Sequence, residues 1–157
     1  MSNLYLICGQ PASGKSTIAK YYVDKHPKTK WVSRDAIRFS LLKDDESYFD
    51  KEDETYRKFV GDICDNLLNG YHVIADQTNL TPSTRNKLLK AIARKGGTYE
   101  HVYAIWVKTP LETSLKRNEG RTGREHVPPY AITGMFNRMI PPSIEEGFDE
   151  VFVINEE

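Results

Sequence analysis

The sequence predicts an α/β domain in which helices flank a five-stranded, mostly parallel sheet. Two observations predict this class. Short apolar runs alternate along the chain with helical patterns, as in strands that are joined by crossover helices. The chain has 157 residues, which suits one hydrophobic core, so we expect a single domain over residues 1–157.

The first half of the chain contains three predicted strands. The apolar run at 3–9 indicates a strand that is buried on both faces, and a helix is predicted at 15–26. A short strand at 29–33 and a short helix at 34–42 follow. The amphipathic pattern at 51–69 predicts a longer helix that stops at a glycine, and the third strand is predicted at 71–76.

The second half continues the alternation. A helix at 81–97 begins with a capping threonine and a proline, and the fourth strand is predicted at 99–107. Predicted next are a helix at 109–118, a polar loop at 119–127, a helix at 128–139 and a last strand at 150–154. This order implies a right-handed, doubly wound sheet.

The segment GQPASGKST at 9–17 carries the strongest chemical signal. Gly9, Gly14, Lys15 and Ser16 fit the G-x-x-x-x-G-K-[ST] pattern between a strand and a helix, which predicts a P-loop NTPase domain. The glycines let backbone N–H groups curl around phosphates, while the lysine neutralises them and the serine binds Mg²⁺. The predicted nucleotide-binding residues of this segment are Gly9, Gln10, Pro11, Ala12, Ser13, Gly14, Lys15, Ser16 and Thr17.

Asp76 ends the third predicted strand, and two interpretations fit it. Its carboxylate suits Mg²⁺ held through water, whereas aspartate is also common as a turn or cap residue at strand ends. With a P-loop in the same chain, we favour the metal role.

The other motifs of the chain indicate which class of P-loop protein it is. A guanine-specific switch needs an Asn-Lys-x-Asp stretch, but the nearest candidate, NKLL, has Leu89 in place of the aspartate. Motor ATPases are usually larger. A small α/β domain with arginines late in the chain suits a phosphotransferase, because phosphoryl transfer depends on positioning and charge stabilisation.

Residues 117–128 form a candidate lid, hereafter the lid, which is expected to be mobile. It carries Arg117, Arg121 and Arg124, which are separated by glycines that allow movement. Arginines that swing onto a transferring phosphoryl group neutralise charge and exclude water. The alternative is a solvated surface loop.

The segment VSRDAIR offers an acceptor site. Asp35 is placed to accept the proton of an attacking hydroxyl, and Arg38 lies on the same helical face, where it would bind an acceptor phosphate. The alternative is that Ser33 or Asp35 caps the helix and Arg38 pairs with Asp35. However, a cation in the first turn opposes the helix dipole, which favours an incoming anion.

Composition limits the partners. The formal net charge is zero, which argues against a protein that coats long stretches of nucleic acid. Cys8 and Cys64 lack the spacing of a structural metal site, and the apolar start LYLIC is too short for a signal peptide or a membrane span. We therefore expect a cytoplasmic protein without a membrane partner.

Five segments together resemble the P-loop kinase domain of phage-type 5′-polynucleotide kinases and related small P-loop kinases. They are GQPASGKST, VSRDAIR, VIADQTNLTPSTR, LKRNEGR and PPSIEEGFDEV, in this order over nearly the whole chain. The resemblance implies transfer of the γ-phosphate of ATP, with Mg²⁺, to the 5′-hydroxyl end of RNA or DNA. It also implies the cytoplasm of a bacterial or phage-infected cell and, since the chain stops after the fifth strand, the 5′ step of end repair alone.

By this resemblance, Lys15 and Ser16 grip ATP and Mg²⁺, and Asp35 is the general base. Arg38 binds the 3′-phosphate of the acceptor nucleotide. Asp76 resembles the essential aspartate of the acceptor site, which competes with its metal role. Asn79, in the same motif, is expected to bind the acceptor.

The resemblance is loosest in the lid. Arg121 resembles the arginine that contacts the ATP phosphates and is counted as catalytic with Lys15 and Asp35, but Arg124 also fits this role. Arg117 would stack on adenine. The alternative functions are a kinase of a small molecule (a nucleoside, a sugar or a nucleotide sugar) and a non-catalytic ATP-binding switch.

The acidic stretch at 44–60 has two interpretations. It covers the acceptor cleft with Tyr48 or Phe49 stacked on a base, or it is a solvated helix face with its aromatic side chains packed inward. We expect the second.

Overall fold

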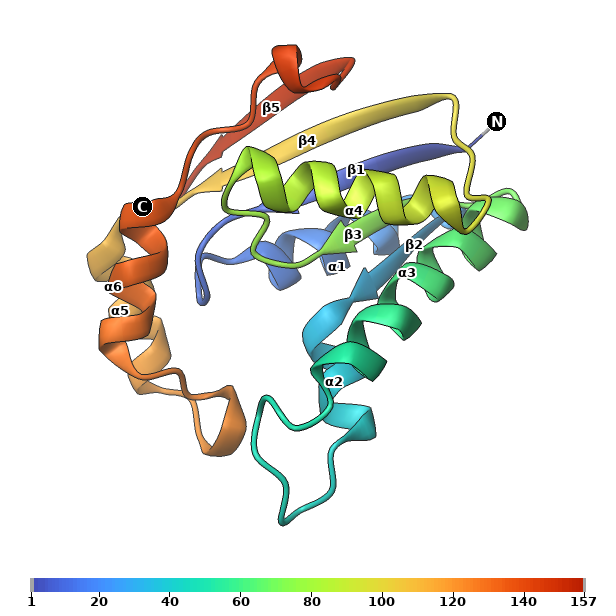
Figure 1. Ribbon diagram of the computed structural model, residues 1–157. Helices are drawn as coiled ribbons and strands as arrows, with labels where there is room; N and C mark the ends of the chain where they lie inside the picture. The colour runs from blue at the N-terminus through green and yellow to red at the C-terminus, as the bar shows by residue number, and fades with distance from the viewer. Residues whose placement is uncertain (1, 157) are drawn as a thin grey trace.

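The computed structural model describes residues 2–156 and contains one five-stranded sheet (Figure 1). The strands lie in the order β2-β3-β1-β4-β5, and every pairing between them is parallel. Their bounds are β1 Asn3–Cys8, β2 Thr29–Ser33, β3 His72–Asp76, β4 His101–Lys108 and β5 Glu150–Asn155. The sheet is thus fully parallel where the sequence predicts a mostly parallel one, and each predicted strand is present.

Helices cover both faces of this sheet. They are α1 Lys15–Lys25, α2 Arg34–Leu41, α3 Glu52–Leu68, α4 Pro82–Arg94, α5 Leu111–Glu119 and α6 Pro129–Arg138, with two short 3-10 helices, η1 Gly123–Glu125 and η2 Ile144–Glu146. Figure 1 shows α3 and α4 over one face of the sheet and α1 behind the other. No helix within residues 2–156 is long and apolar enough to cross a membrane.

Two apolar clusters hold these layers together. On the side of α3 and α4, fully buried Leu4 and Leu6 of β1 pack with Phe59 and Leu88. On the side of α1, Ile7 packs with the Ala19 methyl group. Successive strand residues point to opposite faces, so a central strand that is covered on both faces is apolar throughout.

Local signals in the sequence place several helix starts correctly. The Thr81 hydroxyl accepts a hydrogen bond of 3.2 Å from the backbone N–H of Thr84 and caps α4, with Pro82 in the first turn. The Ser33 hydroxyl likewise accepts from the backbone N–H of Ala36 at 3.1 Å. Ser33 is therefore the cap of α2, and the carboxylate of Asp35 remains available.

The segment before α3 differs from the prediction. Residues 44–51 form turns, and the helix begins only at Glu52. Phe49 is 71% exposed, so its ring does not pack inward as expected. The reason is local, because Ser47 and Asp50 bind one another through both backbone and side chain (2.8 and 2.7 Å), which stabilises a turn in place of a helix.

The strand order creates the site. The chain moves from β1 to β2 and β3 on one side and then crosses to β4 and β5 on the other, so β1 lies at the switch point. Ligands of open parallel sheets bind outside the carboxyl ends of the strands at this point. The loop after β1, the start of α2 and the end of β3 all lie at this edge (Figure 1).

Candidate active site

The P-loop lies between β1 and α1 and has the backbone geometry of a phosphate cradle. Ala12 (φ 63°) and Gly14 (φ 102°) adopt left-handed conformations that fold the loop back on itself. At Gly9, a Cβ atom would lie 2.7 Å from the Ser13 hydroxyl oxygen and 3.2 Å from the Val107 carbonyl oxygen. Only glycine fits there, and the first turn of α1 follows with free N–H groups for an anion.

Lys15 extends across this loop. Its buried ammonium donates to the carbonyl oxygens of Gly9 (2.9 Å) and Gln10 (3.2 Å). Burial lowers the pKa of Lys15, while the nearby carboxylates of Asp76 and Asp35 act in the opposite direction. These contacts hold the ammonium over the cradle, where it would meet the phosphates of a nucleotide.

Ser16, which follows Lys15 at the start of α1, lies beside Asp76. The Ser16 hydroxyl donates to Asp76 Oδ2 at 3.1 Å, and the Trp31 indole N–H donates to the same oxygen at 2.9 Å. Burial raises the pKa of Asp76, partly offset by Lys15 and these two donors. A hydroxyl and a carboxylate side by side suit Mg²⁺, which prefers oxygen ligands.

A cluster at the start of α2 faces this centre, and we call it the acceptor cluster: Arg34, Asp35, Arg38, Tyr48 and Glu52. The Asp35 carboxylate is 61% exposed. It accepts a hydrogen bond of 2.8 Å from the Tyr48 hydroxyl and pairs with Arg38, whose guanidinium also donates to that hydroxyl at 2.6 Å. The internal Asp35–Arg38 pair, one of the two alternatives from the sequence, is therefore present.

Glu52 was not predicted as a member of the acceptor cluster, and Tyr48 was placed at the acceptor cleft only in the less favoured interpretation of residues 44–60. The Glu52 carboxylate, on the first turn of α3, accepts from Arg38 Nε at 2.9 Å and from Arg34 at 3.2 Å. The Tyr48 ring lies 4.1 Å from the Arg38 guanidinium carbon. No spacing in the sequence signals these contacts, because they depend on how the turns at 44–51 return the chain to α2.

Arg34 is a further cation at the acceptor cluster. Its guanidinium donates to Gln77 Oε1 at 2.8 Å as well as to Glu52. The guanidinium carbon also lies over the ring of Tyr56, 4.9 Å from the ring centroid. The Arg34 Nε–H group is buried and has no hydrogen-bond partner within residues 2–156. The acceptor cluster thus combines two guanidinium groups with an exposed carboxylate, which suits an acceptor that carries both a hydroxyl and an anion.

Two predicted ligand residues point elsewhere. Asn79 is fully buried in a left-handed conformation (φ 49°), and its amide donates to the Ile7 carbonyl oxygen (2.7 Å) and accepts from Gln77 (2.7 Å). Asn79 thus joins the ends of β1 and β3, and its contact with the acceptor stays a prediction. The Gln10 side chain likewise binds Thr109 and Ser114, so only its backbone lines the cradle.

The lid leaves α5 and is closed at its base. The buried Asn118 amide exchanges hydrogen bonds with the backbone of Val127 (2.6 and 3.0 Å), which ties the two ends of the lid together. Beyond this point Gly123 has a left-handed conformation (φ 61°) within η1. The tip of the lid lies across from the turns after α2 (Figure 1), and Arg124 donates to the Lys43 carbonyl oxygen.

The three lid arginines have different surroundings. Arg117 lies against the P-loop, since its NH1 group is 3.1 Å from the position that a Gly14 Cβ would take. Arg121 contacts only the Glu125 carbonyl oxygen (3.3 Å) among the described residues, and its charge contributes to the lowered pKa of Lys15. Arg117 is thus the lid arginine in contact with the P-loop, whereas Arg124 contacts the turns after α2.

Comparison with known proteins agrees with this geometry. A family model described as AAA domain matches residues 4–142. A chain of the Pnkp1/Rnl/Hen1 RNA repair complex is 24% identical (TM-score 0.74), and the match covers 87% of this chain and 43% of that one. A fungal RNA kinase is 13% identical (TM-score 0.62, 98% and 74% covered), and a gluconokinase from Sinorhizobium meliloti is 16% identical (TM-score 0.59, 98% and 82% covered).

These likenesses establish a P-loop kinase fold. All three structures are under 25% identical, so the fold is what they share with this chain. The chain spans less than half of the RNA repair protein that it matches. Nucleotide binding follows from the P-loop, while the acceptor must be inferred from the side chains at the carboxyl edge.

Proposed function

The chain belongs to the AAA domain family, and from that premise we propose that it is an ATP-dependent kinase of the 5′-hydroxyl ends of RNA or DNA. One observation carries the proposal. An exposed carboxylate, Asp35, lies beside the Arg38 guanidinium and close enough to Lys15 to influence its pKa, and Arg34 is a second cation in the same cluster. A nucleic-acid end has this chemistry, since it offers a hydroxyl to a base and a phosphate to cations.

The residues divide between donor and acceptor. Lys15 and the N-terminus of α1 would hold the β- and γ-phosphates of ATP, and Ser16 with Asp76 would hold Mg²⁺. When bound, Mg²⁺ would neutralise negative charge on the phosphates. The proximity of Ser16 and Asp76 supports the metal role of Asp76 over its role in acceptor binding.

Transfer then proceeds as an in-line displacement. The Asp35 carboxylate accepts the proton of the 5′-hydroxyl group, whose oxygen forms a bond with the γ-phosphorus. The bond between the γ-phosphorus and the β–γ bridging oxygen breaks, and ADP leaves. Arg121 stabilises the charge on the transferring group, and Arg38 holds the 3′-phosphate of the acceptor nucleotide so that the hydroxyl is in line.

The decisive assay uses γ-labelled ATP, Mg²⁺ and matched RNA and DNA oligonucleotides with 5′-hydroxyl or 5′-phosphate ends. We expect label only on the 5′-hydroxyl oligonucleotides. Asp35→Asn should reduce transfer by roughly 100-fold or more while ATP affinity is retained, since general bases typically contribute about 10²–10⁴-fold. Asp44→Asn, at an exposed aspartate of the adjoining turns, is the matched control and should be unchanged.

Each alternative has its own outcome. Turnover on a nucleoside or a sugar, with no label on oligonucleotides, would replace the proposal by a small-molecule kinase. Tight ATP binding without any acceptor-dependent turnover, unaffected by Asp35→Asn, would identify a nucleotide-binding switch.

A further inference from the structure

An exposed aromatic ring lies beside the acceptor cluster and takes no part in the mechanism above. Phe49 is 71% exposed, and its ring packs edge-on against Tyr48 with centroids 4.9 Å apart and an interplanar angle of 81°. Scattered exposed hydrophobic residues are common on proteins, so the position of this ring matters more than its exposure. That position is set by Tyr48, whose hydroxyl contacts Asp35 and whose ring contacts Arg38.

The turns that carry Phe49 are fixed by their own hydrogen bonds. The Lys43 N–H donates to Glu46 at 2.8 Å, Ser47 binds Asp50, and the Lys51 ammonium donates to the Leu41 carbonyl oxygen at 2.9 Å. A ring on such a segment loses little conformational entropy when a ligand stacks on it. The face of Phe49 is therefore a preformed apolar surface next to the proposed base.

Phe49 also forms part of the wall of a depression of about 320 Å³ at the first turn of α3. The other lining residues are mainly acidic: Asp50, Glu52, Asp53 and Glu54, with Lys51 and Arg57. Carboxylates repel the phosphate backbone, but they accept hydrogen bonds from the exocyclic amino groups of bases. An aromatic wall with carboxylate acceptors thus suits a nucleobase better than a phosphate or a bare sugar.

We propose that Phe49 stacks on a nucleobase of the acceptor strand and thereby favours nucleic-acid ends over acceptors that lack a base. The inference rests on the proposed function, because it needs Asp35 and Arg38 to hold the 5′-terminal nucleotide of the acceptor. Tyr48 contacts both Asp35 and Arg38 and packs against Phe49, so a nucleotide held by those two residues would place its own base or the next one on the side of this ring. Stacking tolerates every base, since each has a π face.

The test compares Phe49→Ala, Phe49→Trp and wild type on 5′-hydroxyl oligonucleotides that are complete or that lack the base at the first or second nucleotide. We expect Phe49→Ala to raise the KM for the complete acceptor by about 10-fold or more, with kcat and the KM for ATP little changed. Removing the contacted base from the acceptor should raise the KM of the wild type by a similar factor. It should not raise the KM of Phe49→Ala any further. Phe49→Trp should behave like the wild type.

Tyr130→Ala is the matched control, because Tyr130 is an exposed aromatic residue (80%) on α6. Tyr130→Ala should leave kcat, the KM for the acceptor and the KM for ATP unchanged. A second readout is direct binding: 2-aminopurine at the contacted position should be quenched by the wild type and not by Phe49→Ala.

Failure of the inference is distinct from failure of the proposed function. The stacking role is wrong if the wild type labels oligonucleotides and Phe49→Ala has the same KM for the complete acceptor as the wild type. It is also wrong if removal of the base raises the KM of Phe49→Ala by as large a factor as it raises that of the wild type. If the wild type labels no oligonucleotide, the proposed function fails and the stacking role fails with it.

Discussion

The Ser16 hydroxyl donates a hydrogen bond of 3.1 Å to Asp76 Oδ2, although the two residues are 60 positions apart in the chain. This contact joins the P-loop to the end of β3 and provides two oxygen ligands for one cation. We therefore expect Mg²⁺–ATP to raise the Tm of the wild type more than that of Asp76→Asn, by several degrees. ATP with EDTA should raise both equally. Thermal unfolding with each ligand measures this difference.

A different result would assign Asp76 to the acceptor. In that case Asp76→Asn would keep the full stabilisation by Mg²⁺–ATP, and its KM for the oligonucleotide would rise instead.

The protonation of Asp76 gives a second prediction. Burial raises the pKa of Asp76, so the folded state binds this proton more readily than the unfolded chain does. The contribution of Asp76 to stability consequently falls as the pH rises through its raised pKa. Without nucleotide, the Tm of Asp76→Asn relative to that of the wild type should increase between pH 4 and pH 8. A constant difference across this range would mean that the folded and unfolded pKa values are equal.

The role of Arg38 can be separated from its internal pairs. Arg38→Ala should weaken the use of a nucleoside 3′-monophosphate far more than that of the matching nucleoside, with little change in ATP binding. The Arg38 side chain is buried against Asp35 and Glu52, so the Tm of Arg38→Ala should be measured as well. The variant Arg38→Lys, which retains the charge, should be assayed beside it. Equal losses on the two acceptors would contradict phosphate binding.

Glu52 competes for the same guanidinium groups. Glu52→Gln should lower the KM for the phosphate-bearing acceptor by about fivefold, since two unit charges at 4 Å interact by about 1 kcal/mol in water. The control is Glu150→Gln, because Glu150 is exposed on β5, at the opposite edge of the sheet from β2 and α2. A higher KM for Glu52→Gln would show that the carboxylate positions the arginines.

The sequence predicts the donor side of this site better than the acceptor side, for a physical reason. A P-loop is a local structure in which Gly9, Gly14 and Lys15 act within one turn, so their spacing alone carries the chemistry. Strand ends such as Asp76 are also predictable, since carboxyl ends of parallel strands share one edge.

The acceptor cluster depends on contacts between segments. Glu52 lies 14 residues from Arg38, and it reaches the guanidinium only because the intervening residues form turns. Asn79 belongs to a recognisable motif, but its internal contact with the Ile7 carbonyl oxygen and its left-handed backbone have no signal in the spacing. Motif spacing predicts which residues matter, whereas the backbone decides which of them reach a ligand.

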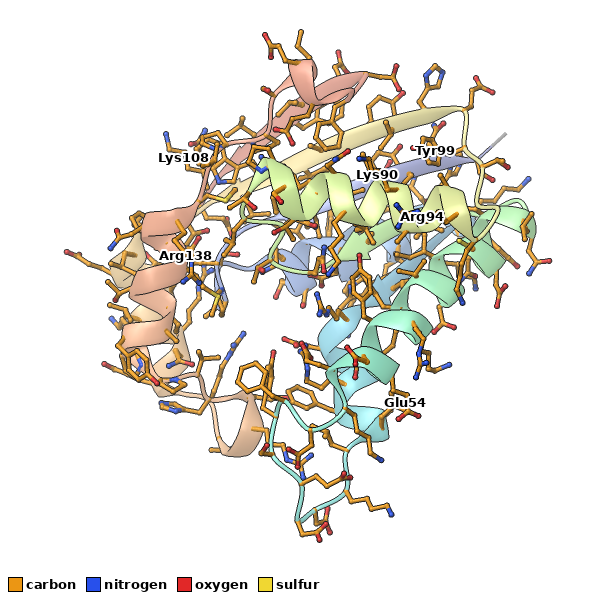
Figure 2. The ribbon with its side chains drawn as sticks, in the orientation of Figure 1. Glu54, Lys90, Arg94, Tyr99, Lys108 and Arg138 are labelled. Carbon is orange, nitrogen blue, oxygen red and sulfur yellow. The ribbon has the colours of Figure 1, made fainter. Side chains whose placement is uncertain are left out.

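The lid offers a test between two arginines. The proposed role of Arg121 is to stabilise the transferring phosphoryl group, so Arg121→Ala should reduce kcat by roughly 1,000-fold, the lower limit for arginines with this role. Arg124→Ala, which breaks a contact with the Lys43 carbonyl group, should change kcat less than 10-fold. Arg94→Ala on α4 is the control, as its exposed side chain lies far from the lid (Figure 2). The reverse order of the two lid variants would assign the catalytic role to Arg124.

The fully buried Arg85 guanidinium connects three parts of the site. It donates to both carboxylate oxygens of Glu146 (2.7 and 2.9 Å) and to the Asn79 carbonyl oxygen (2.7 Å). Removing one partner of a buried ion pair leaves an uncompensated charge, so Arg85→Met and Glu146→Gln should each lower the free energy of unfolding by about 3 kcal/mol. In the double variant, the free energy of unfolding should fall by less than the sum of the two single losses.

Denaturant unfolding of the four proteins in this cycle measures the coupling. Lys90→Met on the exposed face of α4 is the matched control and should change stability by less than about 0.5 kcal/mol (Figure 2). Since Arg85 also holds the Asn79 carbonyl group, Arg85→Met should reduce kcat even at temperatures where it is fully folded. Additive losses in the cycle would mean that Arg85 and Glu146 stabilise the fold independently, and an unchanged kcat would limit their role to stability.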